Sequence, residues 1–86
     1  MTRNTDFFIE AIEKQRKKYE RMKPGNIAYG SNVMPILQLY KGITEFEEQE
    51  NFREALENLL INPDAKKRRY AIDVCLGFLV FSDAIL

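Results

Sequence analysis

Hydrophobic residues recur at helical spacing in four stretches of the chain, and no stretch alternates in the manner of a β-strand. The first stretch predicts a helix over about residues 5–22, with Thr5 as its N-cap and Asp6 in its first turn. Its apolar face is expected to consist of Phe8, Ile12, Tyr19 and Met22. Pro24 and Gly25 follow directly and predict the end of this helix.

A loop is expected over residues 24–32, where proline, glycine, serine and asparagine are concentrated. A short second helix is then predicted over about residues 33–41. Ser31 or Asn32 is the expected cap, and Gly42 is the expected C-terminal stop.

The third and fourth helices are predicted from cap signals as well as from periodicity. Thr44 and Glu47 have the spacing of a capping box at the start of a helix that ends near residue 61. Its apolar side is expected to consist of Phe46, Phe52, Ala55, Leu56, Leu59 and Leu60. Asn62-Pro63-Asp64 then predicts a helix to about residue 84, with Asn62 as cap and Pro63 in the first position. Because the connection is so short, these two helices should form an antiparallel hairpin.

The predicted fold is therefore all-α: a compact bundle of four helices, one of them short, in a single helical domain over residues 1–86. Residues 74–81 are apolar nearly all round, which predicts that the fourth helix is central or covered. Gly77 lies inside this helix, and we expect another helix to approach it closely. Cys75 is expected to be a small buried apolar residue rather than a reactive thiol.

Composition removes most routes to catalysis. The chain has 86 residues, no histidine and one cysteine, so neither a Ser-His nor a Cys-His pair can form within it. A structural zinc site needs four ligands of these types. We therefore predict a non-enzymatic protein without cofactor or metal. The single cysteine also indicates a reducing, cytoplasmic setting, and the most apolar stretch, residues 71–86, is too short and too interrupted by aspartates to span a membrane.

Charge is segregated along the chain although the formal net charge is zero. Residues 45–61 hold six Asp/Glu and one Lys/Arg, whereas residues 1–44 hold four Asp/Glu and eight Lys/Arg. The expected acidic surface comprises Glu47, Glu50, Glu54 and Glu57. The cations gather in two groups, which are Lys14, Lys17, Lys18 and Arg21 in the first helix and Lys66, Lys67, Arg68 and Arg69 in the fourth. These groups could either neutralise the acidic helix internally or face partners of their own.

Two resemblances accompany this pattern. Residues 52–76 resemble one HEAT-type repeat in the motifs Ala55-Leu56-x-x-Leu59-Leu60 and Pro63-Asp64, followed by Arg69, Ala71 and an apolar run. A solenoid needs about three repeats, so this likeness is one of helical hairpins. In size, helicity and acidic face the chain is also similar to small bacterial immunity proteins, which implies binding and neutralisation of a toxin, often a basic nuclease.

Three functional hypotheses follow. The first is a protein-binding module of the immunity or antitoxin type, which binds a basic protein through the four glutamates, with Tyr29 as an aromatic anchor. The second is a nucleic-acid-binding regulator that uses the two groups of cations. The third is a structural subunit or homo-oligomer that associates through the apolar fourth helix.

Overall fold

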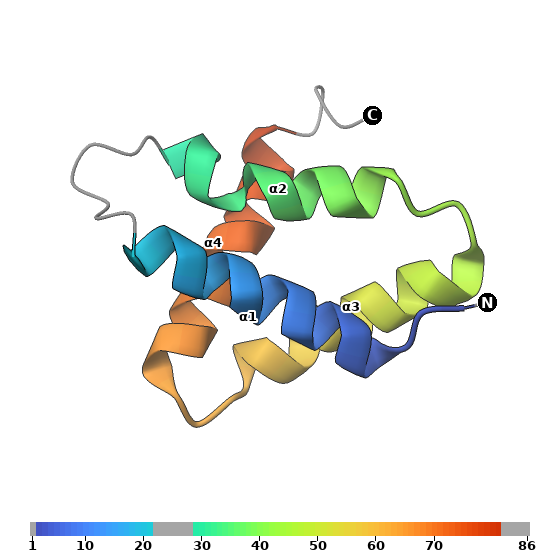
Figure 1. Cartoon of the computed structure of the whole chain (residues 1–86), viewed down its shortest axis with the longest axis horizontal. Helices are drawn as coiled ribbons and strands as arrows, with labels where there is room; N and C mark the ends of the chain where they lie inside the picture. The colour runs from blue at the N-terminus through green and yellow to red at the C-terminus, as the bar shows by residue number, and fades with distance from the viewer. Residues whose placement is uncertain (1, 22–28, 82–86) are drawn as a thin grey trace.

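The computed structural model describes residues 2–21 and 29–81, and for residues 29–31 it describes the backbone alone. Within these ranges the secondary structure consists of four helices: α1 (Thr5–Arg21), α2 (Tyr29–Lys41), α3 (Phe46–Leu60) and α4 (Ala65–Val80). In Figure 1, α1 and α2 lie side by side, and α4 crosses behind them. Helix α3 packs against α1 and α4. The predicted all-α fold and the contact between the last two helices are confirmed.

Twelve buried side chains, drawn from all four helices and from the connection before α3, form the core. They are Phe8, Ile12, Val33, Ile36, Leu37, Ile43, Phe52, Ala55, Leu59, Tyr70, Ala71 and Val74. The ring of Phe52 lies at the centre, with its centroid 5.6 Å from that of Phe8 and 5.1 Å from that of Tyr40. Both distances fall in the range of favourable aromatic pairs, so Phe52 links α3 to α1 and α2.

Helix α2 begins at Tyr29, four residues before the predicted start, so the expected caps at Ser31 and Asn32 are wrong. Asn32 is buried, and its backbone carbonyl accepts a hydrogen bond from the Tyr70 hydroxyl of α4. The first residues of α2 are therefore helical although their composition favours a loop, and this segment is bonded to Tyr70 of α4. The end of α2 is as expected, because Gly42 N–H donates to the carbonyls of Gln38 and Leu39 at 3.2 Å.

Three other predicted caps are displaced by one or two residues. Asn4, not Thr5, caps α1, since its Oδ1 accepts from Phe7 N–H at 2.8 Å. Helix α3 has Glu45 at its N-cap with no side-chain capping bond, so the predicted capping box of Thr44 and Glu47 does not form. Burial of Ile43 just before α3 brings the chain into the helix one residue later than that box requires.

Asp64 caps α4 by accepting from Lys66 N–H at 2.9 Å, so the prediction of Asn62 as cap and Pro63 as first helical residue is wrong. Asn62 instead accepts from Asp64 N–H at 2.9 Å, which forms a turn before the helix. The helix ends at Val80, and residues 82–84 of the predicted helix lie outside the described residues.

Gly77 confirms its expected role. A Cβ at this position would lie 2.9 Å from Cγ2 of Val33 and 3.4 Å from Cδ1 of Leu37. Real Cβ atoms essentially never approach that closely, so the absence of a side chain allows α4 to lie directly against α2.

Two expectations about apolar faces are wrong. Phe46 was expected on the buried side of α3 and is 74 % exposed. The fourth helix was expected to be central or covered over residues 74–81, yet three large apolar side chains of this stretch are exposed, namely Leu76, Leu79 and Val80, and Ile72 before it is exposed on the same side. The bundle covers one half of this helix and leaves the other at the surface.

Candidate functional site

The outer side of α3 carries the four glutamates that the sequence singled out, and we call these residues the acidic face: Glu47, Glu50, Glu54 and Glu57. Spacings of three and four residues place all four on one side of the helix, opposite the buried side chains of Phe52, Ala55 and Leu59. Three of the four are exposed, and the side chain of Glu50 is 43 % exposed. The structure therefore brings the predicted acidic residues together.

Within the described part of the chain, no ion pair involves Glu47, Glu54 or Glu57. Glu50 pairs with Arg53, one turn along the same helix, at 3.4 Å. Both side chains of that pair are well exposed, and exposed pairs of this kind contribute little. The basic residues of α1 and α4 thus do not neutralise the acidic face by direct ion pairs.

Glu48, in contrast, belongs to the interior. Its side chain accepts three hydrogen bonds from Arg3, at 2.7 Å from the backbone N–H, 2.8 Å from Nε and 3.1 Å from Nη2. These bonds to Arg3 lower the pKa of Glu48 to about 2. Asn51 Nδ2 also donates to the carbonyl of Arg3 at 2.9 Å. Glu48 therefore fastens the segment before α1 to α3.

Exposed apolar side chains lie at both ends of the acidic face. Phe46, at the start of α3, is 74 % exposed, and Ile61, directly after its end, is 80 % exposed. Their positions, four residues from Glu50 and from Glu57 respectively, place them on the same side of the helix as the glutamates. A row of carboxylates bounded by apolar groups offers charge attraction and apolar burial to one partner. The side chain of Tyr29, the predicted anchor, lies outside the described residues.

The basic residues of α1 are exposed along the helix. They are Lys14, Lys17, Lys18 and Arg21. No ion pair in the described ranges involves any of them. Glu13 and Glu20 of the same helix pair with Arg16 instead, and Glu13 also lies near Lys67 of α4.

The four cations at the start of α4 have separate roles. Arg68 Nη1 donates to the carbonyls of Asn62 and Pro63, at 2.7 and 2.9 Å, and so holds the turn before the helix. Lys67 Nζ lies 4.0 Å from a Glu13 carboxylate oxygen. Lys66 and Arg69 line the cleft between α1 and α4. The predicted group of Lys66–Arg69 therefore does not form a single basic surface.

Sequence reasoning missed Arg16, which lies on the buried side of α1 between Glu13 and Glu20. Its Nε and Nη2 donate to Glu13 at 3.0–3.2 Å, and its Nη1 donates to Glu20 at 2.6 Å. The hydrogen bond to Glu13 is the largest cause of the raised pKa of Arg16. Carboxylates three residues before and four residues after an arginine are the signal that could have revealed this cluster.

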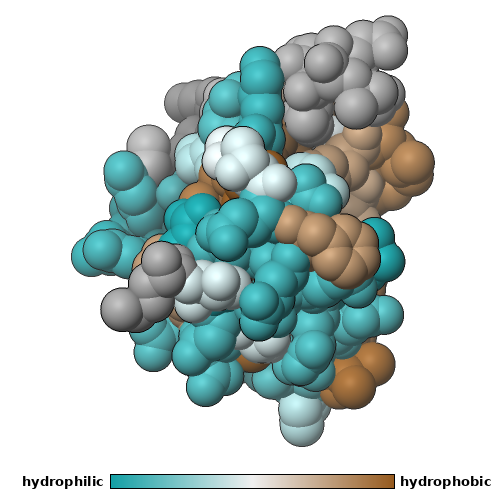
Figure 2. Space-filling view, turned by 90° about the vertical axis from the view of Figure 1, so that its right-hand side faces the viewer, coloured by the Kyte–Doolittle hydropathy of each residue, from teal (hydrophilic) through white to brown (hydrophobic). Residues whose placement is uncertain are grey.

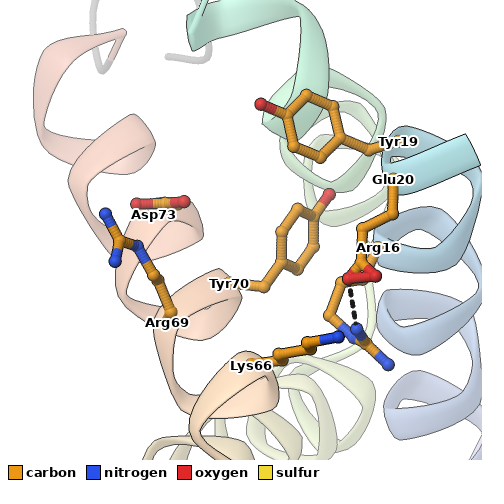
Figure 3. A pocket seen from close by; sticks show the side chains of 7 residues that line it. All are labelled: Arg16, Tyr19, Glu20, Lys66, Arg69, Tyr70 and Asp73. Carbon is orange, nitrogen blue, oxygen red and sulfur yellow. Dashed lines mark hydrogen bonds and ion pairs between the residues drawn. The ribbon is translucent and has the colours of Figure 1, made fainter. Parts of the chain in front are cut away.

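A cleft of about 260 Å³ lies beside this cluster, between α1 and α4 (Figure 3). Its lining is mixed in charge and consists of Arg16, Tyr19, Glu20, Lys66, Arg69, Tyr70 and Asp73. In Figure 3 the rings of Tyr19 and Tyr70 extend from facing helices into the same space.

The cleft offers little chemistry. Burial raises the pKa of Tyr70, so its hydroxyl stays protonated and donates to the carbonyl of Asn32. Burial likewise raises the pKa of Asp73, against the opposing effect of Arg69. Because Arg16 is occupied by two carboxylates and the Tyr70 hydroxyl donates to Asn32, we interpret the cleft as a structural contact between the two helices.

Cys75 is half-buried, and burial raises the pKa of its thiol. A raised pKa disfavours the reactive thiolate, but the expectation of a buried residue is met only in part, because Cys75 lies between the packed and the exposed side of α4. Among the residues that the structure describes, no group of three or more histidine, cysteine, aspartate or glutamate side chains could hold a metal ion.

The fold thus defines a small all-α protein whose described surface carries one acidic and one basic helix face. Comparison of the chain with protein-family models, curated proteins and solved structures gave no match. None of the described helices is both long enough and apolar enough to cross a bilayer.

Proposed function

We propose that this protein is a non-enzymatic protein-binding module of the immunity or antitoxin type, which binds a basic protein through the acidic face of α3. The observation that carries the proposal is that Glu47, Glu54 and Glu57 are exposed together and have no ion pair in the described part of the chain. Three like charges on one rigid helix repel one another, and a cationic partner would relieve that repulsion.

Two further features support binding rather than mere solubility. Phe46 and Ile61 supply apolar surface at the two ends of the acidic face, where an interface can bury it. The helix itself is held firmly, because Phe52 packs in the core and Glu48 is bonded to Arg3. A preorganised surface loses little conformational entropy when it binds.

The test compares two charge variants of the full chain. In the first, Glu47, Glu50, Glu54 and Glu57 are changed to glutamine, and in the second, Lys14, Lys17, Lys18 and Arg21 are changed to glutamine. Both variants alter four side chains at the surface and should fold as the parent does, which circular dichroism can check. Proteins retained by each immobilised variant from the same lysate are identified, and the binding of each candidate is then titrated directly.

We expect a protein of high isoelectric point to bind the parent and the lysine/arginine variant and to lose most of its affinity for the glutamate variant. Affinity should also fall with added salt. Equal binding of every retained protein to the parent and to the glutamate variant would refute the proposal.

The exposed, unpaired cations of α1 support a second candidate, a nucleic-acid-binding regulator. It requires an affinity for DNA or RNA that decreases steeply with salt and depends on Lys14, Lys17, Lys18 and Arg21. Fluorescence anisotropy with mixed-sequence DNA and RNA at low salt decides between the two candidates. Flat titrations at micromolar protein would exclude the second.

A further inference from the structure

The side of α4 that faces away from the bundle carries an apolar stripe, which consists of Ile72, Leu76, Leu79 and Val80. Intervals of four, three and one residues keep these side chains on one face of the helix. Leu79 is 76 % exposed, and Ile72, the most N-terminal member, is 48 % exposed. Figure 2 shows hydrophobic surface gathered at the right-hand edge of a mostly hydrophilic face, on the side where α4 lies.

Cations precede this stripe on the same helix. Arg69 is exposed and lies one turn before Ile72. A cation in the first turns of a helix is opposed by the positive end of that helix's own dipole, so its position does not stabilise α4. Arg69, which also lines the edge of the cleft toward α1, is therefore the one cation that we place beside the N-terminal end of the stripe.

We propose that the apolar stripe of α4 is the contact surface of a homodimer, in which the α4 helices of two copies lie antiparallel across a two-fold axis near Leu76. A two-fold interface needs a surface complementary to itself, and an antiparallel pairing places the apolar half of each helix against the apolar half of the other. This proposal concerns a different helix from the acidic face and does not depend on it.

Charge complementarity favours the antiparallel arrangement. Along the shared helix direction, the two-fold axis places Arg69 of one copy roughly 4.5 Å beyond Val80, the last residue of α4, in the other copy. The last carbonyls of a helix have no partner within it and carry the negative end of the dipole. Arg69 would therefore lie beside the helix end that attracts it.

A second copy fits this face better than an anionic membrane does. The formal net charge of the chain is zero, so two copies do not repel each other strongly. The same zero net charge gives the chain no overall attraction to an anionic bilayer.

The first test measures the mass of the full chain in solution, by sedimentation velocity and light scattering, up to about 1 mM protein, where a dimer of millimolar dissociation constant would be half formed. We expect the parent to pass from monomer to dimer with concentration and Leu76→Glu/Leu79→Glu to stay monomeric. The control is Phe46→Glu/Ile61→Glu, which adds the same charges at exposed apolar positions at the two ends of α3 and should dimerise as the parent does. Circular dichroism checks that both variants fold.

A parent chain that stays monomeric at 1 mM would overturn the proposal. So would dimerisation that survives in Leu76→Glu/Leu79→Glu, or binding of the monomer to phosphatidylglycerol vesicles without any dimer in solution.

The second test examines orientation by disulfide trapping in a Cys75→Ser background. Ile72→Cys and Val80→Cys chains are oxidised separately and as a mixture. Antiparallel packing centred on Leu76 predicts that the mixed disulfide forms several times faster than either self-disulfide. Faster self-disulfides, which a parallel pair would give, would overturn the arrangement.

The third test is Arg69→Gln, which should weaken the dimer severalfold and make its dissociation constant less sensitive to salt. An unchanged dissociation constant and salt dependence would refute the role of Arg69.

Discussion

The two faces of α4 are both apolar, yet only one of them is packed. The inner face presents Ala71, Val74 and Gly77, all buried, and Gly77 lies against Val33 of α2. The outer face presents larger side chains, among them Leu76 and Leu79, and these are exposed. If hydrophobicity alone decided which face is packed, we would expect the outer face of α4 to be the buried one.

The inner face differs from the outer face in having small residues, Ala71 and Gly77, among its buried side chains. Ala71 and Gly77 let the backbone of α4 come close to its neighbours, and the close approach buries Val74 completely between them. Leucine and isoleucine on the other face would hold a neighbouring helix further away. The comparison teaches that, in so small a bundle, the side of a helix that combines small residues with aromatic ones can become the packed side, while leucine and isoleucine on the other side remain at the surface.

The largest expected effect is that of Gly77→Leu. A side chain at this position has no room, since even its Cβ would lie 2.9 Å from Val33 Cγ2. We expect the free energy of unfolding to fall by about 3 kcal/mol, as for severe overpacking of a core. Chemical denaturation measures this, and an unchanged midpoint would show that the approach of α4 to α2 is looser than described.

Truncation of each face sharpens the comparison. Val74→Ala removes fully buried methyl groups and should lower the free energy of unfolding by about 2 kcal/mol. Leu79→Ala removes more atoms from an exposed site and should change it by less than about 0.5 kcal/mol.

Both variants should be unfolded by denaturant at several protein concentrations, because association through the outer face would appear as a concentration dependence. Equal losses at the lowest concentration would mean that the two faces are packed alike.

A double-mutant cycle between Gly77 and Val33 isolates the contact itself. Gly77→Ala should destabilise the protein by roughly 1 kcal/mol, since overlap with Val33 outweighs the gain in helix propensity. In a Val33→Ala background the overlap disappears, and the same change should be neutral or stabilising. A coupling energy of about 1 kcal/mol is therefore expected, and additivity of the two changes would contradict direct contact.

The number of helices, the hairpin of α3 and α4, the role of Gly77 and the acidic face could be predicted from the sequence, because each depends on local spacing. The caps at Asn4, Glu45 and Asp64 could not, because several residues near each helix start have capping side chains and tertiary packing selects among them. The early start of α2 accompanies the hydrogen bond from Tyr70, a contact across 38 residues.

The buried ion pairs could not be predicted from the hydrophobic pattern either. Glu48 belongs to the same acidic run as Glu47 and differs only in the side of the helix on which it lies. Arg16 occupies a position on the apolar face that polar residues normally avoid, and Glu13 and Glu20 compensate its burial. The hydrophobic pattern predicts that every charged side chain is exposed, so it does not reveal charged side chains that are buried as ion pairs.

Cys75 lies between the inner and the outer face of α4, so the reactivity of its thiol measures how far solvent reaches between them. Burial raises the pKa of its thiol above the ordinary value of 9.0. Alkylation of the native protein at pH 8 should therefore be several times slower than alkylation of the unfolded chain, and its rate should rise through a midpoint above pH 9. The folded state holds this proton more tightly than the unfolded state does, so the contribution of Cys75 to stability should decline as the pH rises above about 9.

The control is Leu79→Cys in a Cys75→Ala background, where alkylation should be nearly as fast as in the unfolded chain at protein concentrations low enough to keep the protein monomeric. If the thiol of Cys75 in the native protein reacts as fast as that control, Cys75 is accessible to solvent and does not belong to the packed side of α4. If it reacts more slowly, but only at protein concentrations where dimers form, the outer face itself covers the thiol, and alkylation becomes a second measure of the homodimer.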